Sequence, residues 1–258
     1  MYSKLSRKLH NFFLIPTVFK NWFKVWVYLL IIYMPFTGLK VATPIVHLRS
    51  SIKLKIRLKN VLDIGSILET HTKKEYTPVK LRVPENAAII DIGASIGDFS
   101  IFCASFFKGS SCFCFEPNMV AYKICQENIS LNNLQSRIKC YPLAVSNKAG
   151  EMMIGKDMFE AITFDQIFTD NKIDKCDLLK IDIEGAEYAM LMNTAKDTLK
   201  RIMAITMECH IYSDKGEELS KLKQYLLEQG FQVETTPIST HRVCYLYAFR
   251  QILNKGVS

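Results

Sequence analysis

The chain has no long hydrophobic run, no internal repeat and no low-complexity segment. Its longest apolar stretch, Val25 to Phe36, has 12 residues, whereas a helix that spans a bilayer needs about 20. The charged start and the apolar patch that follows it, Phe12 to Ile15, lack the small-residue cleavage site of an export signal. We therefore predict one α/β domain at residues 84–258, preceded by an extension at residues 1–83.

The cysteines lack the arrangement of a metal site or a disulfide framework. All eight lie after Phe102, mostly inside apolar runs, where cysteine usually serves as a small buried hydrophobe. No Cys and His residues have the paired spacing of a zinc site, so we expect no bound metal. We expect free thiols in a reducing compartment and place the protein in the cytoplasm.

Acidic residues are scarce in the extension. Residues 1–83 contain 15 Lys and Arg against 3 Asp and Glu, a net charge of +12, whereas residues 84–258 carry a net charge of −4. A basic arm of this kind can face anionic lipid, nucleic acid or a phosphate-bearing substrate, or it can be a solvated surface. No RNA-binding module or RNP-type aromatic strand is present, so we expect no nucleic-acid partner.

The aromatic stretch Trp22 to Phe36 is too short and too interrupted to cross a membrane. Its aromatic residues and the flanking Lys20 and Lys24 suit a membrane interface. The alternatives are a helix that covers the catalytic core and a contact with another subunit. Peripheral contact at the inner membrane face therefore stays open, as does the oligomeric state.

The most informative stretch is AAIIDIGASIGDFS at residues 87–100. It reads as a strand that carries Asp91, a turn bracketed by Gly93 and Gly97, and a helix. The next acid after an apolar run is Glu116, which is 23 positions beyond Gly93 and suits the two ribose hydroxyls of an adenosine. The glycine pattern alone is weak evidence, because such turns join many strands and helices without a ligand.

A third stretch, DLLKIDIEGAEYAML at residues 177–191, reads as a buried strand that ends in Asp182 and Glu184. Together with DIGASIGDFS, FEPN, ITFDQI and MECH, in that order and at similar spacing, it resembles the FkbM family of S-adenosylmethionine-dependent methyltransferases. The resemblance covers about Tyr76 to His210, and KIDIEGAE is its most specific part. The chain departs from the family at Ser95, where an Asn is usual.

The resemblance implies the class I methyltransferase fold, a doubly wound, Rossmann-like and mainly parallel seven-stranded sheet whose last strand is inserted antiparallel. It also implies S-adenosyl-L-methionine as cofactor, with the adenine beside the segment from Leu143 to Ser146. The residues it assigns to cofactor binding are Asp91, Gly93, Ser95, Gly97, Glu116, Asn118, Ala144 and Asp182.

Alternating apolar runs and helical patterns support a mainly parallel sheet. The expected strands are Ile89–Ile92, Ser111–Phe115, Lys139–Leu143, Leu178–Ile183, Ala204–Glu208, Phe231–Thr235 and Val243–Phe249, the last two forming a hairpin. The main helices expected are Asn118–Asn132, Glu187–Asn193 and Glu217–Glu228. In the extension, Lys53–Lys59 alternates like a half-buried strand. Asp165 is expected to cap a helix.

Ligands of open α/β sheets bind at the carboxyl ends of the strands, which brings the strand-end acids and His210 into one cleft. His210 is the preferred base for removing a hydroxyl proton, because an unperturbed imidazole has a pKa of about 6.5. Asp182 and Glu184 are the second choice. The segment that contains Asp63, Glu69 and Tyr76 is expected near the mouth of this cleft.

We therefore predict a methyltransferase that acts on a hydroxyl of a sugar, glycan or related natural product, the acceptor class being implied by the resemblance alone. A metal-dependent variant would use Asp182, Glu208 and His210 as ligands. The alternatives are an NAD-linked sugar oxidoreductase, a nucleic-acid methyltransferase that uses the basic arm, and a non-catalytic membrane-associated protein. The dinucleotide fingerprint Gly-x-Gly-x-x-Gly is absent, because Ser95 stands where its second Gly would be.

Overall fold

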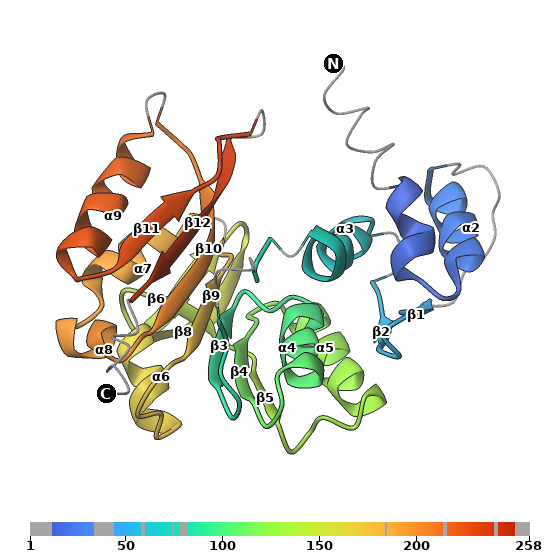
Figure 1. Cartoon of the computed structure of the whole chain (residues 1–258), viewed down its shortest axis with the longest axis horizontal. Helices are drawn as coiled ribbons and strands as arrows, with labels where there is room; N and C mark the ends of the chain where they lie inside the picture. The colour runs from blue at the N-terminus through green and yellow to red at the C-terminus, as the bar shows by residue number, and fades with distance from the viewer. Residues whose placement is uncertain are drawn as a thin grey trace, which may run out of the picture.

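A computed structural model describes residues 12–33, 44–57, 60–73, 75–77, 82–183, 185–213, 216–239 and 242–250. The N-terminal elements lie at one side of the molecule, and a large sheet with flanking helices forms the rest (Figure 1). All statements below refer to these residues.

A seven-stranded sheet forms the centre of the molecule, with the strand order β11-β12-β10-β9-β3-β4-β5. All neighbouring pairs from β10 to β5 are parallel, and β12 is antiparallel to both of its neighbours. The predicted doubly wound, mainly parallel sheet with an inserted last strand is therefore confirmed. Its strands are β3 (Ala88–Ile92), β4 (Ser111–Phe115), β5 (Ile138–Tyr141), β9 (Leu178–Ile181), β10 (Ala204–His210), β11 (Gln232–Thr235) and β12 (Val243–Phe249).

Helices cover both faces of this sheet (Figure 1). Helices α4 (Asp98–Phe106) and α5 (Met119–Leu131) pack on one face, where their apolar side chains join the first hydrophobic core. Helices α6 (Phe164–Asp170), α7 (Glu187–Asn193), α8 (Lys196–Lys200) and α9 (Glu217–Glu228) supply apolar side chains to the second core. The two cores are what a two-faced sheet requires, because its central strands have side chains buried on both sides.

The extension shares the first core instead of forming its own. It contains α2 (Trp22–Tyr33), β1 (Ile45–His47), β2 (Lys53–Lys55), α3 (Leu62–Leu68) and the π-helix η2 (Glu69–Lys73). The Asn128 side-chain amide on α5 accepts from the Lys55 amide at 2.6 Å and donates to the Lys55 carbonyl at 3.0 Å, which attaches β2 to the helices of the large sheet. The predicted boundary between residues 83 and 84 stays a prediction.

Two predictions for the extension need correction or restriction. The predicted strand Lys53–Lys59 is shorter: β2 ends at Lys55, and Arg57 turns to bind Asp63. Residues 58–59 of that prediction, and residues 34–36 of the predicted aromatic helix, lie outside the described part of the chain. In the described ranges, every helix is too short or too polar to cross a bilayer.

A small second sheet was not predicted from the sequence. It has the order β6-β8-β7 and consists of β6 (Ala144–Ser146), β7 (Gly150–Ile154) and β8 (Asp157–Thr163). Helix α6 follows it and is capped by Thr163, whose hydroxyl accepts from the Gln166 amide. The prediction that Asp165 caps a helix is wrong: Asp165 lies in the first turn of α6, and its carboxylate reaches across to accept from the Ala195 amide and the Thr198 hydroxyl at α8.

Candidate active site

A cavity of about 970 Å³ opens at the carboxyl ends of β3, β4, β9 and β10. This size is at the upper end of small-molecule sites. Its walls include Asp63, Glu69 and Tyr76, so the expectation that this part of the extension lies near the site is confirmed. The strands supply the floor and the extension supplies one wall.

The glycine turn and Glu116 form one side of the cavity. Gly93 has a φ of +79°, and a Cβ added there would lie 1.8 Å from the carbonyl oxygen of Asp182. Only glycine fits this close approach of two chain segments. The Glu116 carboxylate accepts hydrogen bonds from the amides of Ser95 and Asn118, at 2.8 and 2.9 Å. Burial raises the pKa of Glu116, while these two amides favour its charged form.

Ser95 is held from the extension. The Arg57 guanidinium donates to the Ser95 hydroxyl at 2.9 Å and to the buried Asp63 carboxylate at 2.5 Å. The side chain that replaces the family's usual Asn therefore has a partner, and it ties the glycine turn to α3. Sequence analysis missed Arg57, because its role depends on a contact across 38 positions.

Three of the predicted cofactor residues lie behind the cavity wall. Of the described residues that line the cavity, none is Asp91, Gly97 or Asn118. Asp91 is fully buried beneath the turn and accepts from the Ser100 hydroxyl. Gly97 has a φ of +82° and begins α4. The Asn118 side chain caps α5. Their positions indicate that these three residues shape the turn, whereas Gly93, Ser95, Glu116, Ala144 and Asp182 face the cavity.

A buried lysine connects the strand ends. Lys180 Nζ donates to the Gly93 carbonyl at 2.8 Å and lies 3.3 Å from Asp91 and 3.8 Å from Asp182. Burial opposes the charge of Lys180, but the Asp91 and Asp182 carboxylates raise its pKa above the usual range. The ammonium therefore holds the glycine turn against β9. The sequence signal for this role is a lysine inside an otherwise apolar strand.

Tyr76 joins two of the strand-end acids. Its hydroxyl lies 3.1 Å from Asp182 Oδ2 and 3.0 Å from Glu208 Oε2. One hydroxyl proton serves only one of the two contacts, so the other requires a proton on a carboxylate. Burial and the neighbouring Asp182 carboxylate raise the pKa of Glu208.

His210 lies at the end of β10 and lines the same cavity. Its Nδ1 is 3.1 Å from Oε1 of Glu187, a fully buried carboxylate that also accepts from the amides of Gly185 and His210. The hydrogen bond to Glu187 raises the pKa of His210 to about 8 despite partial burial. His210 is therefore a stronger base than the unperturbed imidazole assumed from the sequence. Glu184, the other predicted acid of this segment, lies outside the described residues.

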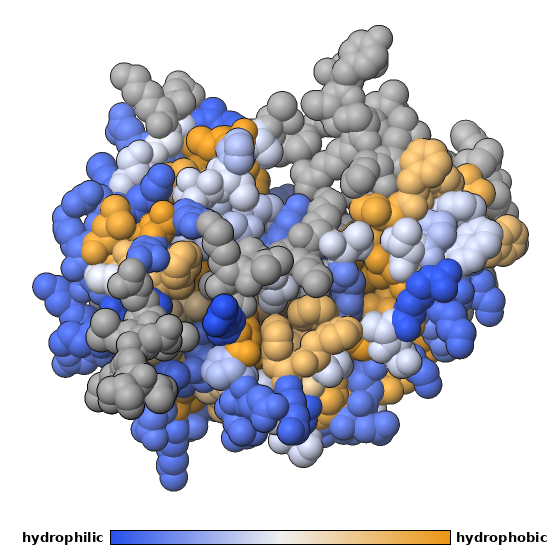
Figure 2. All heavy atoms as spheres, in the orientation of Figure 1, coloured by the Kyte–Doolittle hydropathy of each residue, from blue (hydrophilic) through white to orange (hydrophobic). Residues whose placement is uncertain are grey.

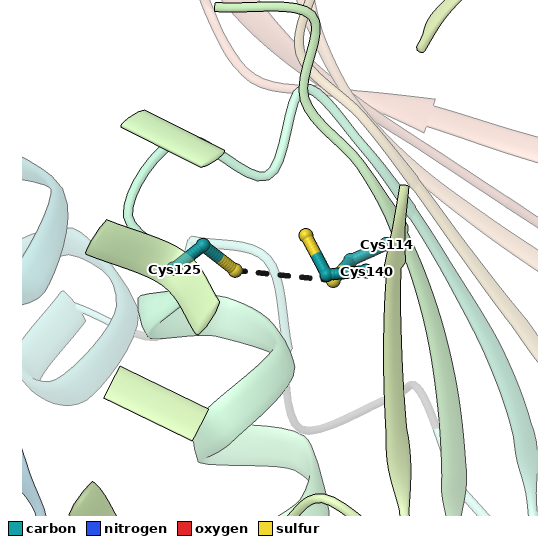
Figure 3. A group of neighbouring side chains, drawn as sticks. All are labelled: Cys114, Cys125 and Cys140. Carbon is teal, nitrogen blue, oxygen red and sulfur yellow. Dashed lines mark hydrogen bonds between the residues drawn. The ribbon is translucent and has the colours of Figure 1, made fainter. Parts of the chain in front are cut away.

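Three thiols lie together outside the cavity wall. The Sγ atoms of Cys114, Cys125 and Cys140 are all within 4.8 Å of one another (Figure 3). Cys114 and Cys140 are paired on β4 and β5, and Cys125 faces them from α5. A soft metal ion is the kind that three sulfur ligands suit. The cysteine spacing in the sequence did not reveal this group, because the fold assembles it from three elements.

Residues 91–233 match the family described as "Methyltransferase FkbM domain". The methyltransferase sdnD of Sordaria araneosa is 23% identical, and the alignment covers 58% of this chain and 76% of that protein. Among solved structures, the protein PH0793 of Pyrococcus horikoshii is 14% identical with a TM-score of 0.50, covering 80% of this chain and 71% of that chain. The delta-N METTL16 methyltransferase domain is 15% identical with a TM-score of 0.50, covering 77% and 88%. At these identities the solved structures show the fold alone, which is the class I Rossmann-like methyltransferase fold.

Proposed function

The chain belongs to the FkbM methyltransferase family, and we propose that it transfers the methyl group of S-adenosylmethionine to a hydroxyl oxygen of a sugar, glycan or related natural product. The observation that carries this proposal is a single cavity with Glu116 on one side and His210 on the other. The first suits the ribose of the cofactor and the second suits proton removal from an acceptor. The family membership favours methyl transfer over the NAD-linked oxidation considered from the sequence.

The residues on the glycine-turn side fit S-adenosylmethionine. Each Glu116 oxygen already accepts one backbone amide and has a second lone pair for a ribose hydroxyl. Phe115, Leu143 and Val145 give the neighbouring wall an apolar surface for the adenine ring, with Ala144 beside them. Asp182, at the end of β9, offers a carboxylate for the amino acid end of the cofactor. When bound, the cofactor would supply an electrophilic methyl group on its sulfonium sulfur.

The acceptor side requires a base that is neutral when it meets the hydroxyl. A proton on Nδ1 of His210 is stabilised by Glu187, which leaves Nε2 free to accept the hydroxyl proton. The imidazolium that forms is stabilised by the same carboxylate. In this arrangement His210 is the proposed catalytic base and Glu187 is a positioning residue. Glu208 and Tyr76 provide hydrogen-bonding groups for the acceptor in the same cavity.

Calorimetric titration with S-adenosylmethionine and with its demethylated product tests the cofactor half of the proposal. We expect the intact protein to bind both, and Glu116→Ala to weaken binding about 10- to 100-fold, because it removes hydrogen bonds to a charged acceptor. Glu85→Gln is the matched control, since this exposed carboxylate on the loop before β3 pairs only with Lys108 among the described residues. Absence of binding by the folded intact protein would overturn the proposal.

The acceptor half is tested by screening sugars and glycans for methyl transfer with the intact protein and with His210→Gln. We expect methylated oxygen in the product and a strong loss of kcat in the variant, with cofactor affinity retained. Exclusive methylation of nucleic acid would replace the proposed acceptor class with the alternative suggested by the basic arm.

A further inference from the structure

A hydrophobic stripe is exposed along helix α2. Phe23, Val27 and Leu30 are 64%, 39% and 56% exposed, and their spacing places them on one face of the helix. The opposite face is buried, with Val25 and Tyr28 in the first core. The helix is therefore anchored to the protein by one side and presents the apolar residues of the other side to the surroundings.

Aromatic contacts extend this stripe to the helical residues 12–18. Phe12 stacks on Trp26 with a ring separation of 4.7 Å, and Trp22 joins Trp26 to Phe23 through two edge-to-face contacts. Phe13, which is 70% exposed, lies against Phe12. We call the exposed residues of this surface the aromatic patch: Phe12, Phe13, Phe23, Val27 and Leu30. Contiguous apolar surface of this kind usually marks an interaction site.

A basic cleft of about 360 Å³ begins directly before α2. It is lined by Lys20, His47, Leu48, Arg49, Ser51 and Lys53. Backbone hydrogen bonds build it: the Lys20 amide donates to His47, and the Arg49 amide donates to Val18. Among the residues that the structure describes, no carboxylate lines the cleft and none forms an ion pair with Lys20, Arg49 or Lys53. The cleft therefore offers uncompensated positive charge to an anion.

We propose that the aromatic patch and the basic cleft together form a docking surface for a bilayer of anionic phospholipid. Figure 2 shows hydrophobic side chains at the edge of the molecule formed by α2, with hydrophilic side chains next to them. The apolar residues would enter the interface while the cleft binds phosphate head groups, the division of labour of an interfacial helix. With 12 residues, α2 is about 18 Å long and lies in the plane of the membrane.

The chemistry of the surface favours lipid over other occupants. Nucleic acid would neutralise Lys20, Lys24 and the cleft but would leave the aliphatic residues Val27 and Leu30 without a partner. A second copy of the chain would cover the apolar residues but would bring two clefts of the same charge together. An anionic bilayer satisfies both halves, and the net charge of +12 on residues 1–83 strengthens its attraction.

Vesicle flotation of the full chain tests the proposal, with vesicles of phosphatidylcholine alone and with phosphatidylglycerol added. We expect binding to the anionic vesicles only. The double variant Phe23→Ser with Leu30→Ser should bind the vesicles about tenfold more weakly or worse, because it loses two apolar side chains that would be buried in the bilayer. The double variant Lys20→Glu with Lys53→Glu should weaken vesicle binding about 25-fold or more, because each lysine charge lost weakens binding roughly fivefold.

The matched control is Lys196→Glu with Lys221→Glu, which makes the same change of charge on the exposed surfaces of α8 and α9. It should leave binding nearly unchanged. Unchanged melting temperatures show that each double variant is folded. Equal vesicle binding by all variants would overturn the proposal. Two other results would also overturn it. One is a dimer of the intact protein that does not bind vesicles and that the double variant Phe23→Ser with Leu30→Ser dissociates. The other is binding of RNA without binding of vesicles.

Discussion

Replacing Glu187 by Gln is expected to lower the pKa of His210. Glu187 is fully buried, and its carboxylate lies 3.1 Å from Nδ1 of the imidazole. This contact is the main reason that the pKa of His210 is raised from 6.5 to about 8. Gln keeps the size and one oxygen acceptor of Glu but removes the negative charge. The pKa should therefore fall from about 8 toward the ordinary value of 6.5.

This shift changes both the availability and the strength of the proposed base. At pH 7 about a tenth of His210 is neutral when its pKa is about 8, and about three quarters is neutral when its pKa is about 6.5. The pH at which kcat rises should move down with the pKa. The plateau of kcat at alkaline pH should fall, because a less basic imidazole removes a hydroxyl proton less effectively.

Titration of the imidazole resonances by NMR measures the effect directly, with His210→Gln used to assign the resonance. His71 serves as an internal reference, since burial alone lowers its pKa to about 4 and the change at Glu187 should not move it. The raised pKa also means that the His210–Glu187 contact stabilises the fold below about pH 6.5 and less as the pH rises through about 8. A His210 pKa that stays near 8 in Glu187→Gln would refute this reasoning.

Four further substitutions test the scaffold of the site by thermal unfolding. Gly93→Ala should lower the free energy of unfolding by more than about 3 kcal/mol, because it combines a left-handed φ with a backbone clash. Its control, Gly65→Ala, should stabilise α3 by about 0.5–1 kcal/mol. Equal effects of the two substitutions would contradict the proposed packing of the turn. Tyr76→Phe should cost about 1–3 kcal/mol, since two half-buried carboxylates lose their shared hydroxyl; an unchanged melting temperature would contradict that contact. Lys180→Met should cost about 3–5 kcal/mol by leaving Asp91 buried without its cation, and a neutral or stabilising effect would show that the ion pair is dispensable.

Much of the candidate site could be predicted because its residues follow buried strands. Once Asp182 and His210 are placed at the ends of parallel strands, topology alone brings them to one edge of the sheet. Asp91 and Asn118 follow the same motifs but face away from the cavity, since strand residues alternate between faces and a cap side chain bonds to its own helix. The position of a residue in its motif does not show whether its side chain faces the cavity or packs behind the cavity wall.

The contacts between distant segments were beyond the sequence patterns. Arg57 reaches Ser95 and Tyr76 reaches Glu208 across 38 and 132 positions. The small sheet β6-β8-β7 was missed because β6 has only three residues, and β7 and β8 are largely exposed and carry little apolar alternation. Its edge contributes Met152, Met153 and Ile154 to the cavity, so part of the cavity wall was not visible in the motifs.

The sequence by itself determined the fold class, the glycine turn and the family, because each depends on the local order of apolar runs, glycines and acids. Only the tertiary structure decided which acids face the cavity, that Glu187 makes His210 a stronger base, and that three separate cysteines meet. The same holds for the aromatic patch, since the helical pattern of α2 does not reveal which of its apolar residues the core buries. The physical reason is that exposure, charge proximity and pKa depend on neighbours that the folded chain brings from distant positions.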